Sequence, residues 1–194
     1  MKRLSVLVPA AALTAGLLSG VPASARTTVT PKDFPSAAKV ATAVPALAGA
    51  TRSTKPLAGM PIVPSCTTTK VLKASSARVA IYTADSSTLI ATGMVAEMKS
   101  VKAAKRVLAS RRKELSCGTV SAEGLTATYA EGTAAQLGDD RVAQRITIEG
   151  VTGVTDLVTL RKGARVIAIG VVSSDGATST DLTPLVRAAY RTGR

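Results

Sequence analysis

Alternating or continuous apolar positions predict six β-strands between residues 78 and 172. The clearest is 141–149, where aliphatic side chains alternate with polar ones, as in a strand with one buried face. The segments 154–161 and 164–172 are apolar on both faces, so we expect them in the centre of a sheet with cover on each side. The six predicted strands are 78–83, 89–98, 125–130, 141–149, 154–161 and 164–172.

Only Lys162 and Gly163 separate the last two of these strands. A spacing of two residues, one of them glycine, predicts a tight hairpin. In that register Val158 lies opposite Ile167. We therefore expect these two strands to be neighbours in an antiparallel sheet.

Residues 100–116 have the period of an amphipathic helix. Ser100 is a suitable N-cap, and Gly118 is the residue type that commonly ends a helix. The apolar stripe that we expect to be buried consists of Val101, Ala104, Leu108 and Leu115.

Two shorter helices are predicted near the ends of the chain. The first covers 36–47, although Pro45 falls in its last turn, where proline disfavours helix. The second follows Thr180 and Asp181, which can cap it, and continues to about Arg191.

This order of elements predicts an α+β fold: an antiparallel β-sheet of about five to six strands with helices packed on it. The domain organisation that we expect is a secretory signal peptide at 1–25, a Pro/Ala/Thr-rich N-terminal arm at 26–64 with one short helix, and an α+β domain at 65–194.

The first residues have the layout of a signal peptide. Lys2 and Arg3 precede the largely apolar segment 4–21, and small residues at 23–25 provide a cleavage site. Position 21 is Val21, so there is no cysteine for lipid attachment. We expect a secreted protein, extracellular or associated with the cell wall, with no transmembrane anchor in the mature chain.

The arm at 26–64 contains six prolines, which interrupt long elements. One interpretation is a tether or wall-spanning spacer. The other is a segment packed across the edge of the sheet. Composition leaves both open.

Composition restricts the chemistry of the protein. There is no histidine, which excludes Ser-His-Asp and Cys-His nucleophiles and imidazole zinc sites. The formal net charge of +13 favours anionic partners such as wall polymers, or else keeps an exported protein soluble. Aromatic residues make up only 2% of the chain, so few side chains are available to stack on nucleic-acid bases. We expect no enzyme activity, catalytic residue, metal or cofactor, no specific nucleic-acid binding, and a monomer or weak dimer.

Cys66 and Cys117 are the only cysteines, and both follow the signal peptide. An oxidising compartment predicts a disulfide between them. Their spacing is not that of a redox or metal-binding pair, so we interpret the bridge as structural.

The helix predicted at 100–116 is densely basic on its polar face. Glu114 alone opposes these charges. The face is either an anion-binding surface or a solvated helix surface. The candidate anion-binding residues are Lys99, Lys102, Lys105, Arg106, Arg112 and Lys113, with Arg111 on the same face.

Three carboxylates are candidate catalytic groups. Asp139 and Asp140 are adjacent in a loop and follow a glycine, which is ordinary turn chemistry. Asp156 lies inside an apolar strand, where it faces an arginine or lies at the sheet end. If it were buried without a partner, its pKa would rise and it would be a candidate site.

Several short motifs occur in order between residues 93 and 191. They are residues 94–100 leading to 115–118, Leu137-Gly138-Asp139 before a strand, and 158–163 leading into 165–168. Together they resemble the actinobacterial "sensor domain" family of exported proteins and lipoproteins, which includes the extracellular domain of the mycobacterial receptor kinase PknH. The resemblance implies an α+β domain whose concave face binds a ligand, without enzyme activity. This chain has one potential disulfide where the extracellular domain of the kinase has two. The resemblance assigns no binding residue in this chain.

We therefore expect a secreted, non-enzymatic, sensor-like binding protein of the cell envelope or extracellular space, with an unknown ligand. One alternative is an envelope protein held to anionic polymers by the basic helix face. The other is a secreted hydrolase or protease inhibitor.

Overall fold

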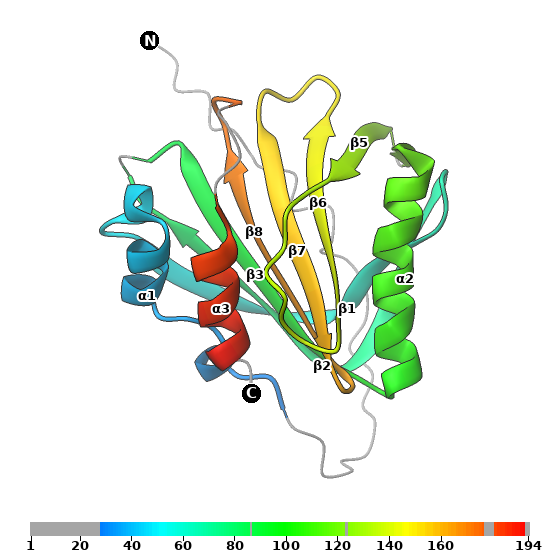
Figure 1. The fold of residues 1–194 in the computed structure, drawn as a ribbon, viewed down its shortest axis with the longest axis horizontal. Helices are drawn as coiled ribbons and strands as arrows, with labels where there is room; N and C mark the ends of the chain where they lie inside the picture. Colours follow the sequence, from blue (N-terminus) through cyan, green and yellow to red (C-terminus); the bar gives the residue numbers. More distant parts are fainter. Residues whose placement is uncertain (1–27, 86, 123, 177–180, 193–194) are drawn as a thin grey trace.

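The computed structural model describes residues 28–85, 87–122, 124–176 and 181–192 (Figure 1). The signal peptide predicted at 1–25 lies outside the described residues, as does Thr180 of the predicted C-terminal cap.

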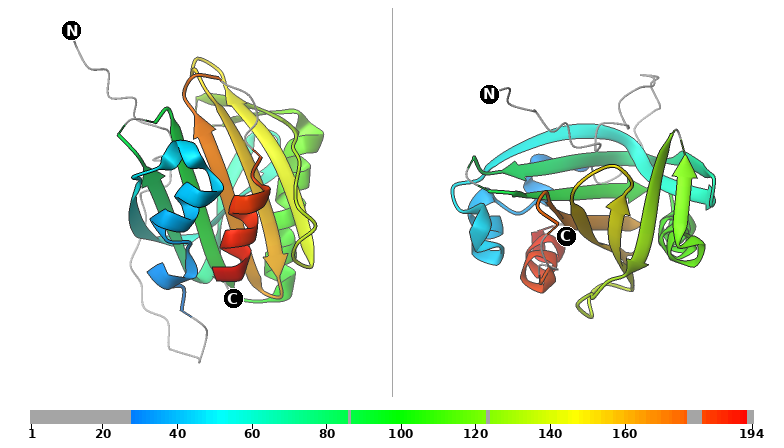
Figure 2. Two further views of the ribbon diagram at one scale, coloured as in Figure 1. Left: turned by 60° about the vertical axis from the view of Figure 1, so that its left-hand side comes forward. Right: turned by 90° about the horizontal axis from the view of Figure 1, so that it is seen from above.

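Eight strands in this described part of the chain form one antiparallel sheet that curls into a half-barrel (Figure 2). Their order across the sheet is β1-β2-β3-β8-β7-β6-β5-β4. The strands are β1 (Thr51–Ser65), β2 (Thr68–Thr83), β3 (Leu89–Met98), β4 (Thr119–Ala122), β5 (Leu125–Glu131), β6 (Asp140–Ile148), β7 (Val154–Lys162) and β8 (Arg165–Ser173). The helices are α1 (Ala37–Ala43), α2 (Val101–Cys117) and α3 (Thr183–Thr192), with single 3-10 turns at Pro31–Asp33 and Pro45–Leu47.

The predicted fold class, an α+β sheet of about five to six strands, is wrong. The fold is mostly one large eight-stranded sheet with three short helices among the described residues. The largest omission is β1, which contains Pro56, Pro61 and Pro64. It forms an edge of the sheet, where proline is tolerated at positions whose backbone N–H would point away from the one neighbouring strand.

The predicted hairpin exists, but its register differs by two residues. The turn is formed by Gly163 and Ala164, so Val158 lies opposite Ile169 instead of Ile167. A shift of two residues keeps every side chain on its predicted face, because side chains alternate with a period of two.

Helix α2 has the ends that the sequence predicts. The Ser100 hydroxyl accepts a hydrogen bond from the backbone N–H of Ala103 at 3.1 Å, and Gly118 follows the helix with a φ of 68°. The chain leaves β3 through α2 to reach β4 at the far edge of the sheet. The strands β4 to β8 then return as a meander, so that β8 pairs with β3.

The two faces of the sheet carry separate cores. Val158 of β7 packs in a cluster with Leu185 of α3 and Val40 of α1. Its neighbour Leu157 packs with Leu108 of α2. Because adjacent strand residues point to opposite faces, α2 covers one face of the sheet while α1 and α3 cover the other.

Tyr82 is fully buried in β2, and its hydroxyl donates a 2.7 Å hydrogen bond to the carbonyl of Pro35. Burial raises the pKa of Tyr82 from 10.0 to about 12. The unfolded chain therefore releases this proton at a lower pH than the folded one, so the stability that Tyr82 contributes is complete below pH 10.0 and is lost as the pH rises towards about 12. We expect urea unfolding of Tyr82→Phe to show a weaker pH dependence in this window.

The matched control is Tyr190→Phe, because Tyr190 is only half-buried. If wild type and Tyr82→Phe lost stability equally between pH 10.0 and about 12, burial of Tyr82 would not be the cause.

Candidate functional site

Three hollows of the surface meet where the chain leaving β5 crosses β6. Gly132 and Ala143 line all three. The backbone N–H of Gly132 donates to the carbonyl of Ala143 at 3.1 Å, and a Cβ at Gly132 would lie 3.1 Å from the backbone nitrogen of Gln144. Glycine thus allows the crossing segment to run close to β6.

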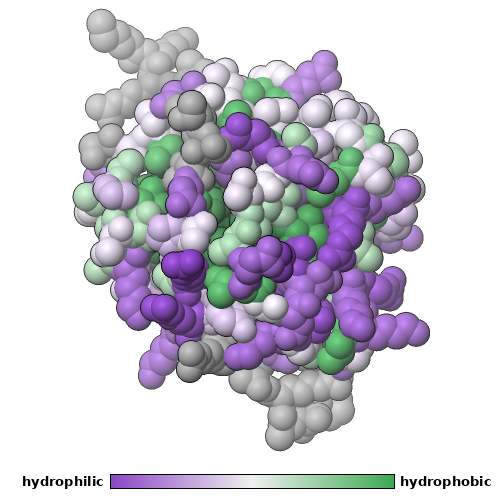
Figure 3. All heavy atoms as spheres, in the orientation of Figure 1, coloured by the Kyte–Doolittle hydropathy of each residue, from purple (hydrophilic) through white to green (hydrophobic). Residues whose placement is uncertain are grey.

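The first hollow, which we call the central groove, has a volume of about 390 Å³. Its floor is formed by β6 and β7, one wall by residues 131–133 and the other by the start of α3. In Figure 3 hydrophobic surface lies in the middle of this side of the molecule, bordered by hydrophilic side chains. Its lining includes Glu131, Thr133, Arg145, Asp156, Asp181 and Leu182.

An ion pair lies in the floor of the groove. Arg145 of β6 is directly opposite Asp156 of β7, and its Nε and Nη2 donate to the two carboxylate oxygens at 2.9 and 3.1 Å. The hydrogen bonds and charge of Asp156 raise the pKa of Arg145. Of the alternatives for Asp156, the structure shows the arginine partner, so this carboxylate is not an unpartnered buried acid.

Asp181 forms the rim at the start of α3. Its carboxylate accepts a 2.9 Å hydrogen bond from the backbone N–H of Thr183, and this bond lowers the pKa of Asp181. Glu131, at the end of β5, is exposed on the opposite wall. Because Arg145 neutralises Asp156, the carboxylates of Glu131 and Asp181 are the two that remain available to a ligand. They make the groove locally negative in a protein whose formal net charge is +13.

The second hollow lies between α2 and β5, and a buried polar network forms behind it. Glu114 of α2 has no exposed surface. Its Oε1 accepts from Nη1 of Arg111 at 2.6 Å and its Oε2 from Nε2 of Gln144 at 2.8 Å. Tyr129 is half-buried beside this network, and its pKa is raised by burial and then by the negative charge of Glu114.

Sequence reasoning missed this network, because Arg111 was assigned to the exposed basic face. Arg111 is only 6% exposed, and its Nη2 also donates to the carbonyl of Pro61 in β1 at 3.2 Å. A signal was available, since Arg111 is four residues after Val107 and three after Leu108, which places it within the buried stripe.

The other candidate basic residues lie on the outside of α2. Arg112 forms an ion pair with Asp140 of β6. All of the predicted anion-binding residues are exposed: Lys99, Lys102, Lys105, Arg106, Arg112 and Lys113.

Asp139 and Asp140 bind different partners. Asp139 accepts hydrogen bonds from Nη1 of Arg161 at 2.9 Å and from the backbone N–H of Gly163 at 2.7 Å. Partial burial would raise the pKa of Asp140, but its hydrogen bond and charge interaction with Arg112 outweigh that effect and lower it. The two carboxylates stabilise the structure separately and do not form an acid–base pair.

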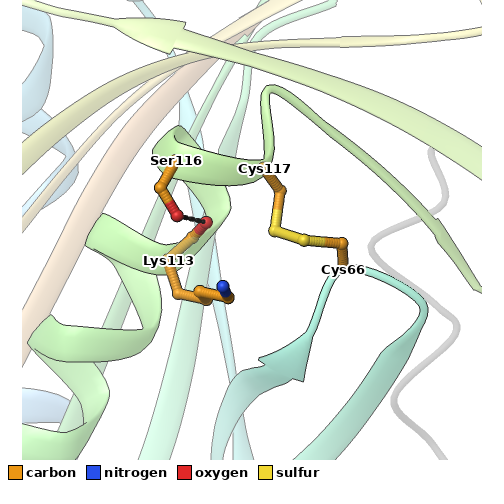
Figure 4. The surroundings of a disulfide bond; sticks show 4 residues. All are labelled: Cys66, Lys113, Ser116 and Cys117. Carbon is orange, nitrogen blue, oxygen red and sulfur yellow. Dashed lines mark hydrogen bonds between the residues drawn. A yellow bond between two sulfur atoms is a disulfide. The ribbon is translucent and has the colours of Figure 1, made fainter.

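The disulfide predicted from the sequence is present. It links Cys66, in the turn between β1 and β2, to Cys117 at the end of α2, with the Cα atoms 5.6 Å apart (Figure 4). The backbone N–H of Ser121 in β4 also donates to the carbonyl of Cys66 at 3.3 Å. The bridge therefore lies where the hairpin of β1 and β2 meets the other edge of the curled sheet.

The fold and site define a disulfide-bonded, curled antiparallel half-barrel with a polar groove on the face that carries α1 and α3. No family model and no curated protein sequence matches the chain. Among solved structures the chain is similar to the crystal structure of the extracellular domain of PknH from Mycobacterium tuberculosis. The TM-score is 0.56 at 12% identity, and the match covers 87% of this chain and 96% of that chain.

This similarity confirms the resemblance expected from the sequence at the level of the fold alone, and membership of the family stays a prediction. A disulfide and a fold shared with an extracellular domain fit an extracellular location. None of the helices within the described ranges combines the length and the apolar character needed to cross a membrane.

Proposed function

We propose that the protein is a secreted, non-enzymatic, sensor-like binding protein of the cell envelope or extracellular space, and that its ligand binds in the central groove. The observation that carries the proposal is the groove itself, built from β6, β7, the crossing segment and the start of α3 on a fold similar to the extracellular domain of PknH. The predicted signal peptide at 1–25 would direct the protein out of the cell.

The groove chemistry favours binding over catalysis. The Asp156 carboxylate is held at both oxygens by Arg145, and Asp181 caps α3, so each has a structural task. A general acid or base needs a pKa near the working pH, whereas the hydrogen bond to Thr183 lowers the pKa of Asp181. These groups suit recognition by charge and hydrogen bonds.

The lining also indicates a class of ligand. Glu131 and Asp181 both line the groove as carboxylates, and the buried side chain of Leu182 forms an apolar part of the lining. Such a lining is complementary to a small molecule with an amino group and an aliphatic part. Fragments of the cell wall that carry free amines combine these features.

Thr133→Trp is expected to abolish ligand binding, because an indole at this exposed position would fill the mouth of the groove. We would measure the thermal unfolding midpoint with soluble muropeptides and with short-chain phospholipids. A probe at 100 times its Kd should raise the Tm of the wild type by about 5–11 °C and leave that of Thr133→Trp unchanged.

The matched control is Thr119→Trp, which puts the same side chain on an exposed threonine of β4 outside the groove. It should respond as the wild type does. The proposal is refuted if no probe shifts the Tm of the wild type, or if Thr133→Trp retains the shift.

A further inference from the structure

The outward side of α2, together with Lys99 just before the helix, carries a row of exposed cations that do not line the central groove. We call Lys99, Lys102, Lys105, Arg106 and Lys113 the basic ridge; all five are exposed. Hydrophilic side chains cover the side of the molecule where α2 lies (Figure 3). The helix packs on the sheet through its opposite side, with Ala104, Val107 and Leu108.

The ridge cations have no carboxylate partner among the residues that the structure describes. The ion pairs found there are formed by arginines outside the ridge: Arg111, Arg112, Arg145, Arg161 and Arg165. Lys102 and Arg106 are four residues apart on the helix, where like charges repel each other. Neither packing nor pairing within the described residues accounts for this concentration of charge.

Three of the five ridge cations form a line along α2. Lys102, Arg106 and Lys113 are separated by four and seven residues, which keeps them close to one line along the helix. At a rise of about 1.5 Å per residue, the distance along the helix axis from Lys102 to Lys113 is about 16 Å. A partner must therefore present several negative charges in a row.

We propose that the basic ridge binds a linear polymer that carries phosphate groups along its chain. Such a polymer can follow a row of point charges, and the ammonium groups of Lys102 and Lys113 need no fixed orientation to pair with phosphates. Its binding is driven by release of counterions, which requires charge and not shape.

The composition of α2 argues against nucleic acid and against a membrane as the partner of the basic ridge. The helix has no aromatic residue on which nucleic-acid bases could stack. Its one large exposed apolar side chain is Val101 in the first turn, whereas helices that lie on membranes insert a whole apolar face. The apolar face of α2 is occupied by the sheet.

The test is retention of the mature, oxidised protein on immobilised inorganic polyphosphate over a range of salt concentrations. Replacing three ridge charges in Lys102→Gln/Arg106→Gln/Lys113→Gln should lower the slope of log affinity against log salt by about 2 and weaken binding at low salt at least about tenfold. The matched control Lys39→Gln/Lys55→Gln/Lys70→Gln removes the same charge from exposed lysines elsewhere and should retain the wild-type slope.

Three results would overturn the proposal. The first is no retention of the wild type at low salt, and the second is an equal loss in the ridge and control variants, which would mean that net charge alone drives retention. The third is binding to phosphatidylglycerol vesicles without binding to polyphosphate, which would indicate a membrane surface. Thr133→Trp should bind polyphosphate normally, so failure of the ridge proposal and of the groove proposal can be told apart.

Discussion

Replacing Glu114 with alanine is expected to lower the free energy of unfolding by about 3–5 kcal/mol. The substitution leaves the guanidinium of Arg111, which is 6% exposed, without its carboxylate partner. It also removes one of the two acceptors of Gln144 Nε2, in a residue that is only 1% exposed, and leaves the carbonyl of Arg111 as the other. Urea unfolding at neutral pH would measure the loss.

Two comparisons identify the buried charge as the cause. The double variant Arg111→Met/Glu114→Met removes both charges and should recover most of the lost stability, because no ion is then left unpaired. Arg112→Ala breaks the neighbouring ion pair to Asp140, but Arg112 is 50% exposed, so its loss should cost about 1 kcal/mol or less. Equal effects of Glu114→Ala and Arg112→Ala would contradict the assignment.

Loss of the disulfide is expected to have a similar effect. The two cysteines are 51 residues apart in sequence, and closing a loop of that length restricts the unfolded chain by about 4 kcal/mol in the chain-entropy model. Cys66→Ser/Cys117→Ser should therefore lower the thermal midpoint by about 8–16 °C. Differential scanning calorimetry without reductant would measure it.

Reductant supplies the control for this prediction. Dithiothreitol should lower the midpoint of the wild type to near that of the double serine variant, and should leave the variant itself unchanged. Thiol titration of the denatured, non-reduced wild type should find no free thiol, since both cysteines are bridged. A double variant as stable as the wild type would show that the bridge does not stabilise the fold.

Either change removes a large part of the stability of a domain of this kind, which is commonly about 5–15 kcal/mol. Both act at the same end of α2. The disulfide is at Cys117 and the buried carboxylate is at Glu114, one turn earlier. The end of α2 is thus held to the β1–β2 turn by a covalent bond, and to Pro61 in β1 and Gln144 in β6 by the hydrogen bonds of Arg111 and Glu114.

The parts of the fold that sequence reasoning located are those whose pattern is local. Ser100 and Gly118 delimit α2 because capping involves only neighbouring backbone groups. The apolar runs of β7 and β8 identify a central hairpin because both faces of those strands are buried.

The omitted strands have no such local pattern. Strand β1 contains three prolines and β4 has only four residues. Both lie at edges of the sheet, where one side of the strand needs no partner and the side chains are partly exposed. The rules of composition and periodicity that find central strands therefore pass over them.

The candidate site, like the fold, has parts that the sequence predicts and parts that it does not. The basic residues of α2 and the disulfide partners could be named from the sequence, because charge and cysteine count are properties of composition. The groove could not, since Glu131, Arg145 and Asp181 come from a strand end, a strand and a helix cap that only the sheet brings together. Arg145 and Asp156 are eleven residues apart, and they meet only through the register of β6 on β7.

The sequence alone determined a sheet-rich body with two cysteines, an amphipathic basic helix and no histidine, because these follow from residue type and local period. Tertiary structure alone decided how far the sheet extends, which partners the buried charges of α2 meet and where a groove opens. The reason is physical: strand pairing, the hydrogen bond from Gln144 to Glu114, and the walls of the groove depend on contacts between segments far apart in the chain, and those contacts have no signature in any single segment.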